Sequence, residues 1–258
     1  CQYGWVNTTP GPEWREGVAK MVSPIEVRVS GPWACFTRPE HKSERVSYPV
    51  MTPSAARGIL ESIFWKPEFE WIIQEIWVLS PIRFFSIVRN ELKNPQSERA
   101  ARRWQGTNDG YFAEDDHTPR HTLMLRDVDY IIRAQVKLRS HANDNEAKYR
   151  DQARRRIEKG QAFQMPYLGM RELVAEVRKP RGDERPIPVT QNLGRVFFDH
   201  AFVPDPNGPI QFVNPGRRSL VQGKTVPLFF EARLENGILK VPQSLYEELS
   251  GIVAGKTR

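Results

Sequence analysis

Apolar and polar residues follow helical or strand periodicity in a fixed order between residues 25 and 159, and this order constrains the fold most. In chain order, the sequence predicts a strand (25–30), a helix (53–64), two strands (69–79 and 82–88), a loop (90–119), a strand (122–138) and a helix (143–159). Gly31-Pro32 is expected to end the first strand, and Asp127 to mark a bend or bulge in the long one. The order approximates a β-α-β-β-α-β arrangement if a final strand follows residue 160.

The helix over 53–64 has a well-defined start, which fixes the position of one tyrosine. Thr52 is a good N-cap and Pro53 suits the first helical position. Tyr48 lies just before this start, after a short charged loop that carries Arg38, His41, Lys42 and Arg45. A phenol beside several cations suits an anionic substrate, whereas the simpler interpretation is a half-buried anchor next to a solvated loop.

The remainder of the chain predicts more strands and one further helix. Residues 161–177 suggest a strand, a glycine turn and a strand, 178–188 a hairpin tip or linker, and 242–250 a short helix. We therefore expect an α+β protein with two domains. A ferredoxin-like domain of the RNA-recognition type would occupy 21–185, and a smaller antiparallel β-rich domain 186–258. Residues 1–20 are expected to be an extension ahead of the fold, tag-derived or upstream.

The charge balance favours a polyanionic partner. The chain has 38 Lys and Arg against 31 Asp and Glu, a net charge of +7 and a pI of about 9.5. Nucleic acid is the commonest such partner, and an anionic membrane surface is the rival. No apolar run approaches the roughly 20 residues of a membrane span, so no membrane partner is expected. Two cysteines form neither a disulfide framework nor a zinc motif, which is typical of a cytoplasmic protein.

Three residue types needed for metal-independent RNA cleavage are available. Such a reaction uses the ribose 2′-OH as nucleophile and needs a base, an acid and a cation for the phosphorane charge. Tyr48, Arg120 and His121 supply these types, although 72 residues separate Tyr48 from His121 and spacing does not bring them together. Any single histidine is more often a plain surface residue. A metal-dependent alternative would use Asp115, Asp116, His117 and His121.

Two further segments could contact phosphate. Arg154, Arg155, Arg156 and Lys159 end the second helix, where they either complement the helix dipole or face an RNA backbone. Tyr167, Gly169 and Arg171 offer stacking, close backbone approach and a cation, although an isolated glycine is more often a plain turn. The sequence contains neither a P-loop nor a dinucleotide-binding fingerprint.

Four segments resemble one known family. They are ACFTRPEHKSERVSYPVMTPSAARGILESIFWKP (34–67), PIRFFSIVRNE (81–91), TLMLRDVDYIIRA (122–134) and RRRIEKGQAFQMPYLGMREL (154–173). The chain resembles the CRISPR-associated, crRNA-processing proteins of type I-C systems, the fifth Cas family in its "d" subtype, within the RAMP superfamily. The resemblance is most specific in the first segment, extends from about Ile25 to Leu173 and weakens towards the end.

The resemblance implies a function and a set of partners. It implies metal-independent cleavage of precursor CRISPR RNA in its repeat, leaving a 2′,3′-cyclic phosphate, with no cofactor. The product's 5′ handle would stay bound beside the backbone and large subunits of the surveillance complex, and duplex DNA is a further candidate partner. The alternative is a non-catalytic RNA-binding subunit of the same kind of complex.

The resemblance also implies site residues. The family's "SY" tyrosine corresponds to Tyr48, and its Lys-His pair to Arg120-His121, where arginine keeps the charge but cannot donate a proton near neutral pH. His117 or Lys137 are alternatives for that pair. The expected RNA-binding residues are Arg38, Lys42, Arg45, Arg154, Arg155, Lys159, Gly169 and Arg171.

Overall fold

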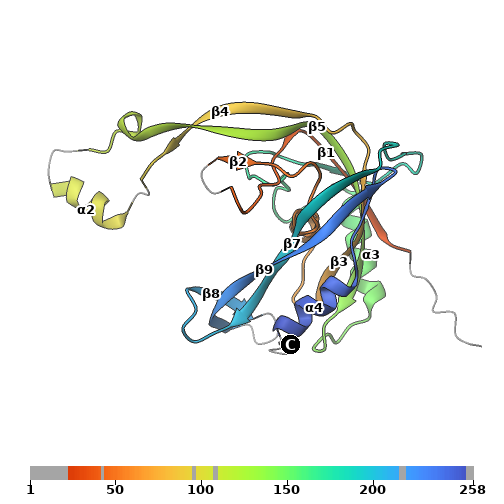
Figure 1. Cartoon of the computed structure of the whole chain (residues 1–258). Coiled ribbons are helices and arrows are strands. Elements are labelled where there is room, and N and C mark those ends of the chain that lie inside the picture. The colour runs from red at the N-terminus through yellow and green to blue at the C-terminus, as the bar shows by residue number, and fades with distance from the viewer. Residues whose placement is uncertain (1–22, 42–43, 95–96, 107–109, 215–218, 254–258) are drawn as a thin grey trace, which may run out of the picture.

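The computed structural model describes residues 23–41, 44–94, 97–106, 110–214 and 219–253 (Figure 1). The expected extension over 1–20 and the candidate Lys42 lie outside these residues. The elements are β1 (Ile25–Ala34), β2 (Arg45–Val46), α1 (Pro53–Ile63), β3 (Phe69–Val78), β4 (Phe84–Leu92), α2 (Glu98–Gly106), a 3₁₀ turn η1 (Ala113–Asp116), β5 (His117–Leu138), α3 (Glu146–Glu158), β6 (Glu176–Arg178), β7 (Gln191–Pro204), β8 (Ile210–Asn214), β9 (Ser219–Glu235), β10 (Ile238–Lys240) and α4 (Ser244–Val253).

A sheet of ten strands runs through the described part of the chain in the order β6-β1-β5-β3-β10-β9-β7. β2 and β4 pair with β5 off this path, and β8 pairs with β9. The pairs are antiparallel except for β2 with β5. A mostly antiparallel sheet with helices packed on it confirms the predicted α+β class.

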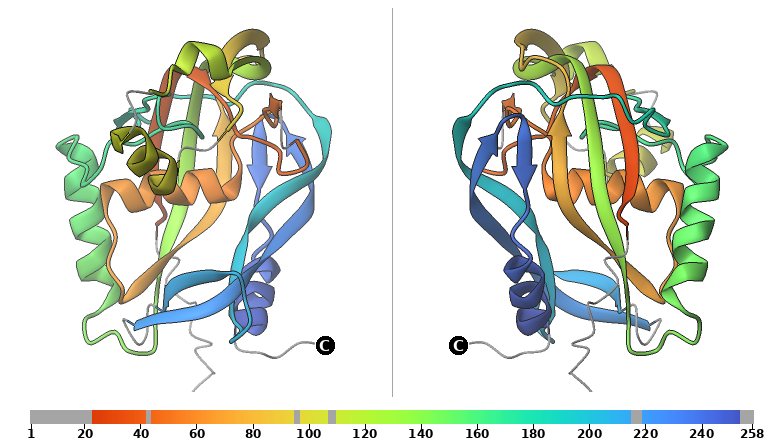
Figure 2. Two further views of the ribbon diagram at one scale, coloured as in Figure 1. Left: turned by 90° about the vertical axis from the view of Figure 1, so that its left-hand side faces the viewer. Right: turned by 90° about the vertical axis from the view of Figure 1, so that its right-hand side faces the viewer.

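Helices α1 and α3 cover the first part of the sheet. Figure 2 shows that α1 crosses the strands and that α3 lies beside it. Helix α1 packs on β3 and β7, and α3 packs on β5, β1 and β6. Thr52 caps α1 by accepting a hydrogen bond from the Ala55 N–H, as its position predicts. The apolar face of α1 is buried through Ala56, Ile59, Leu60 and Ile63. Burying this face against the sheet stabilises α1 and fixes its entrance.

A partly buried ion pair ties α1 to the later strands. Arg57 donates from Nε and Nη2 to the two carboxylate oxygens of Asp199 on β7, at 2.7 and 2.9 Å. Arg57 also donates to Glu61 one turn further along α1, at 2.7 Å. Burial alone would lower the pKa of Arg57, but the two carboxylates raise it. The pair therefore keeps a charged arginine at the junction between α1 and β7.

The prediction of a loop over 90–119 is wrong for most of these residues. β4 continues to Leu92, β5 begins at His117, and the two pair in register from Phe84 opposite Leu125 to Leu92 opposite His117. Figure 1 shows this hairpin projecting from the body of the protein, with α2 near its tip. Side chains along β4 are exposed or only half-buried. At the base of the hairpin Phe85 and Ile87 pack against the core, whereas main-chain pairing holds its outer part, 89–92 with 117–120, and this polar part lacks the usual strand signal.

One other strand boundary differs from the sequence prediction. Gly31-Pro32 does not end β1, because pairing with β5 resumes with Trp33 opposite Arg126. Asp127 has a φ of 53°, which confirms the predicted irregularity in the long strand. Pro32 has no N–H to donate to the ladder, yet the register is the same on both sides of it, since Gly31 lies opposite Val128 and Trp33 opposite Arg126.

The segment after α3 is less regular than expected. Gly160 has a φ of +61° and ends the helix as predicted. Between 161 and 177 the predicted pair of strands is reduced to one bridge, Tyr167 to Val174, and the short β6. The final strands and a helix near 242–250 are confirmed by β7 to β10 and α4. β10 pairs with both β3 and β9, which joins the later strands to the first sheet; the domain boundary at 185/186 stays a prediction.

Candidate functional site

Tyr48 lies at the point where three segments meet. Its N–H donates to the Phe36 carbonyl at 2.8 Å, and the N–H of Ser47 donates to the Leu123 carbonyl of β5 at 2.9 Å. Ser47 Oγ accepts from the Phe36 N–H and donates to the Tyr48 carbonyl. These bonds fix the backbone on both sides of the tyrosine before α1 begins.

The Tyr48 side chain is fully buried. Its exposed fraction is 0%, and its hydroxyl lies beside the backbone of Phe197 without a well-formed hydrogen bond. The Arg38 guanidinium lies over the ring, 4.7 Å from its centroid. Burial raises the pKa of Tyr48, and the nearby Glu40 carboxylate raises it further. The positive charges of Arg38 and Arg195 lower it in part. The phenol is therefore protonated at neutral pH and can donate a proton but not act as a phenolate base.

The parallel pairing of β2 with β5 brings the tyrosine segment next to the predicted Arg-His pair. Arg45 lies opposite Thr122 and Val46 opposite Leu123, directly after His121 in the chain. Successive residues of a strand point to opposite faces, so Arg120 and His121 do not share a face. Arg120 is half-buried and His121 is exposed. The structure thus brings the three backbones together but buries the Tyr48 hydroxyl towards β7.

Arginines gather on the Arg120 face of the β4–β5 hairpin. Arg45 and Arg120 both approach Glu91, at 3.5 and 3.7 Å. Arg89 lies directly opposite Arg120 and forms an ion pair with Glu172 at 2.8 Å. A hydrogen bond from its own N–H lowers the pKa of Glu172, and Arg89 lowers it further. We call Arg45, Arg89 and Arg120 the arginine cluster.

Arg89 is a residue that sequence reasoning missed. It belongs to the segment 81–91 that carries the family resemblance, but its position follows only from the register of β4 with β5. Its charge was one of many in a polar region, and no local pattern distinguished it. Phe197 and Arg195 beside Tyr48 were missed for the same reason, because they come from β7.

The other predicted RNA-binding residues are scattered. Arg155, Lys159 and Arg171 are exposed, whereas Arg154 donates to the Ser23 carbonyl and hydroxyl at 3.0 and 2.9 Å. Gly169 has a φ of +87°, and a Cβ there would overlap the Cys35 carbonyl. Internal packing therefore already requires glycine at 169. The RNA-binding assignments of these residues stay predictions.

The alternatives to the Arg-His pair occupy different places on β5. Lys137 lies near the other end of the strand and pairs with Glu70 at 3.6 Å. His117 begins β5, on the His121 face and towards the hairpin tip. The Asp116 carboxylate accepts from the Asn94 side chain at 2.7 Å and from the Tyr111 hydroxyl at 2.9 Å. Within the described residues, no three His, Cys, Asp or Glu side chains are grouped to hold a metal ion.

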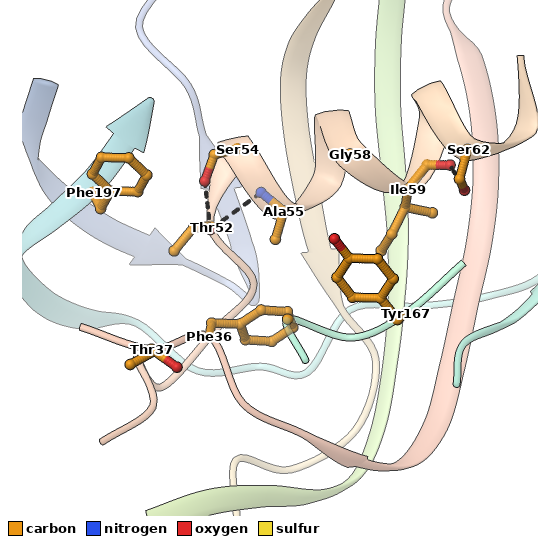
Figure 3. A pocket seen from close by; sticks show the side chains of 11 residues that line it. Phe36, Thr37, Thr52, Ser54, Ala55, Gly58, Ile59, Ser62, Tyr167 and Phe197 are labelled. Atoms are coloured by element: carbon orange, nitrogen blue, oxygen red, sulfur yellow. Dashed lines mark hydrogen bonds between the residues drawn. The ribbon is translucent and has the colours of Figure 1, made fainter. Parts of the chain in front are cut away.

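A groove runs along the outer face of α1 (Figure 3). Its volume is about 270 Å³, and we call it the α1 groove. One wall consists of α1 and its cap, and the other of the segments around Phe36 and Tyr167. The lining residues are Phe36, Thr37, Thr52, Ser54, Ala55, Gly58, Ile59, Ser62, Tyr167, Gly169 and Phe197.

Comparison with known proteins decides the family. Residues 25–242 match the Cas5d family, described as "CRISPR-associated protein (Cas_Cas5)". The chain belongs to the Cas5d family. The resemblance predicted from four sequence segments is thereby confirmed.

Two curated relatives match most of the chain. The sequence is 44% identical over 235 residues to "CRISPR pre-crRNA endoribonuclease Cas5d" of Thermus thermophilus, covering 91% of this chain and 98% of that protein. It is 40% identical over 243 residues to the protein of the same name in Mannheimia succiniciproducens, covering 89% and 99%. Both relatives therefore extend over the arginine cluster and the Tyr48 segment.

The solved structures support the fold. "Crystal Structure of CRISPR-associated Protein" matches with a TM-score of 0.55 at 24% identity, covering 85% of this chain and 91% of that one. The Streptococcus mutans protein SMU1763c matches with a TM-score of 0.54, covering 86% and 93%. In the part of this chain that is described, no helix is long and apolar enough to cross a membrane.

Proposed function

We propose that this chain cleaves precursor CRISPR RNA within its repeat, without a metal ion, and keeps the 5′ handle bound. The names of the two curated relatives support the substrate and the reaction class. The observation that carries the proposal for this chain is the β2–β5 pairing, which places the Tyr48 segment beside Arg120 and His121. The backbone segments that carry a phenol, an imidazole and a guanidinium therefore lie side by side.

The proposed reaction is an intramolecular phosphoryl transfer. The ribose 2′-oxygen forms a bond to the adjacent phosphorus, and the bond from phosphorus to the 5′-oxygen of the next nucleotide breaks. His121 takes the 2′-OH proton, and the protonated Tyr48 hydroxyl donates a proton to the departing 5′-oxygen. Arg120, with Arg45 and Arg89 beside it, balances the charge of the phosphorane. The products are a 2′,3′-cyclic phosphate and a 5′-hydroxyl.

The buried Tyr48 hydroxyl favours a second candidate. With an exposed fraction of 0%, the phenol cannot touch RNA unless the segment around Phe197 moves. A non-catalytic RNA-binding subunit of a surveillance complex would leave Tyr48 as a core residue. The two functions share the same basic surface and differ only in cleavage.

The strand order supports a finer description of the fold. We assign residues 21–185 to a ferredoxin-like domain because β6, β1, β5 and β3 lie side by side with α1 and α3 between them in sequence. Residues 186–258 would form the β-rich second domain. The proposed partners are repeat RNA, mature crRNA and the backbone and large subunits of a type I-C complex in the cytoplasm, with duplex DNA as a further candidate.

The deciding experiment is cleavage of a labelled repeat RNA by the purified protein in excess EDTA. A control RNA carries a 2′-deoxy nucleotide at the cleavage position. Cleavage of the all-ribose RNA alone is the expected result. Tight retention of intact RNA would instead support the non-catalytic subunit, and activity that EDTA abolishes would support a metal-dependent nuclease.

A further inference from the structure

Gly58 occupies a position in the middle of α1 that nothing in the described protein explains. Glycine destabilises a helix interior relative to alanine. A Cβ added at Gly58 would meet no heavy atom within 4 Å, so internal packing does not require glycine there. Gly169, where a Cβ would overlap the Cys35 carbonyl, shows the opposite situation. Close approach of a bound molecule to the helix backbone would account for glycine at 58.

Tyr167 faces Gly58 from the other wall of the α1 groove. Figure 3 shows its ring beside Ile59 and directed towards the helix, with the Ser62 hydroxyl beyond it. Tyr167 is 41% exposed although its segment is held by backbone bonds, from Leu168 N–H to Leu173 carbonyl and from Ala175 N–H to Pro166 carbonyl. The groove therefore presents an ordered, accessible aromatic face opposite a bare stretch of helix.

The neighbouring side chains match a single nucleic-acid strand better than an apolar peptide. Arg38 follows Thr37 at one end of the groove, and Arg195 precedes Phe197 by two residues on β7. Hydroxyls of Thr37, Ser54 and Ser62 line the walls. Ser62 Oγ already donates to the Ile59 carbonyl and can only accept, from a ribose hydroxyl or a base N–H, which leaves Thr37 and Ser54 as the hydroxyls that can donate to phosphate. The net charge of +7 over the whole chain also favours a nucleic-acid strand as the bound molecule.

Beyond Ser62 the exposed apolar surface continues. The N–H groups of Phe163 and Gln164 both donate to the Ser62 carbonyl, at 2.8 and 3.1 Å, which fixes this loop against the end of α1. Phe163 is 79% exposed and Met165 68% exposed. Phe163 and Tyr167 are thus two exposed aromatic side chains in the segment held against α1, and exposed aromatic rings are the usual stacking surfaces of single-strand binding sites.

We propose that the α1 groove holds a single-stranded segment of the RNA, with one base stacked on Tyr167 and the adjacent sugar-phosphate packed against Gly58. This inference rests on the proposed RNA-binding function and adds a site separate from the arginine cluster. In this site Gly58 provides the space, and Tyr167 provides the stacking energy.

The test measures RNA affinity and thermal stability on the same variants of the full chain. Gly58→Ala fills the space over α1, and Gly251→Ala is its matched control, because Gly251 lies in α4 and its Cβ also meets nothing within 4 Å. Tyr167→Ala removes the ring, and Tyr167→Phe retains it. Affinity is read by fluorescence anisotropy with labelled repeat RNA at one fixed salt concentration.

We expect Gly58→Ala to weaken RNA binding about tenfold while raising the melting temperature by about 2–4 °C. Gly251→Ala should leave affinity unchanged. Tyr167→Ala should lose about tenfold in affinity and Tyr167→Phe should bind like the wild type. Wild-type affinity in both Gly58→Ala and Tyr167→Ala would overturn the proposal.

Two other outcomes distinguish a failure of the groove proposal from a failure of the proposed RNA-binding function. If the wild-type chain does not bind repeat RNA, the proposed function fails. If the groove variants bind RNA normally but lose a partner subunit, the groove is a protein-docking site and the RNA proposal is wrong.

Discussion

Arg89 of β4 lies directly opposite Arg120 of β5. Like charges in this cross-strand position repel, and sheets usually avoid them. Here Glu172 and Glu91 offset part of the repulsion, at 2.8 and 3.7 Å. Arg45 adds a third guanidinium through the same Glu91. An anion bound to this face would relieve the repulsion, which makes the arginine cluster the strongest candidate phosphate site outside the α1 groove.

Removing one arginine of the cluster should lower the affinity for RNA and make that affinity less dependent on salt concentration. For Arg89→Gln we expect the slope of log affinity against log salt to become shallower by about 0.7 for each single-strand phosphate that the variant no longer neutralises. Arg233→Gln is the control, since Arg233 is an exposed arginine on β9. Titrations at several salt concentrations give both slopes. Equal slopes for Arg89→Gln and wild type would remove Arg89 from the interface.

Tyr48→Phe should separate catalysis from stability. The hydroxyl is buried without a well-formed hydrogen bond, so its removal should leave the free energy of unfolding unchanged or raise it by up to about 1 kcal/mol. If the phenol takes part in proton transfer, the cleavage rate should fall about 100-fold or more. Urea unfolding and single-turnover cleavage are the measurements. Wild-type cleavage by both Tyr48→Phe and His121→Ala would refute the proposed reaction centre.

Acid should destabilise the protein through Glu184. Burial alone would raise the pKa of Glu184, but hydrogen bonds from the N–H groups of Arg181 and Gly182 and from Arg28 lower it to about 2. Because the pKa is lower in the folded chain, the stabilisation is complete above about pH 4.5 and is lost as the pH falls towards 2. The full effect is about 3 kcal/mol.

The check is urea unfolding of wild type and Glu184→Gln at several pH values. The variant should be less stable at pH 7, and its difference from wild type should shrink between pH 4.5 and 2. A difference that stays constant over this range would mean that the Glu184 charge does not contribute.

Asp199→Asn should loosen the junction between α1 and β7. It leaves the Arg57 guanidinium without its bidentate partner. Since the Arg57 side chain is still 30% exposed, we expect a loss of about 2 kcal/mol rather than the larger loss of a fully buried pair. The melting temperature reports the loss. Asp205→Asn is the control, because Asp205 pairs with Lys224 at the surface and its loss should have little effect.

Local sequence patterns determined the elements that bury a face or carry a cap. The helix after Thr52, the long apolar strand up to residue 138 and the stop at Gly160 were all predictable, because each depends on neighbours a few residues away. The sequence segments around Tyr48 were also specific enough to predict the family.

Tertiary structure alone decided the pairing and the outer part of the β4–β5 hairpin, and the two candidate binding surfaces. The strands over 82–88 and from 122 onwards were predictable, but the polar outer part of the hairpin, 89–92 with 117–120, forms through backbone pairing, which gives no apolar pattern when neither face is buried. Arg89 and Arg120 lie opposite each other although 31 positions separate them in the sequence. Gly58 and Tyr167 line the same groove although they are 109 positions apart. Register and packing between such distant segments place these side chains, and no local pattern in the sequence encodes them.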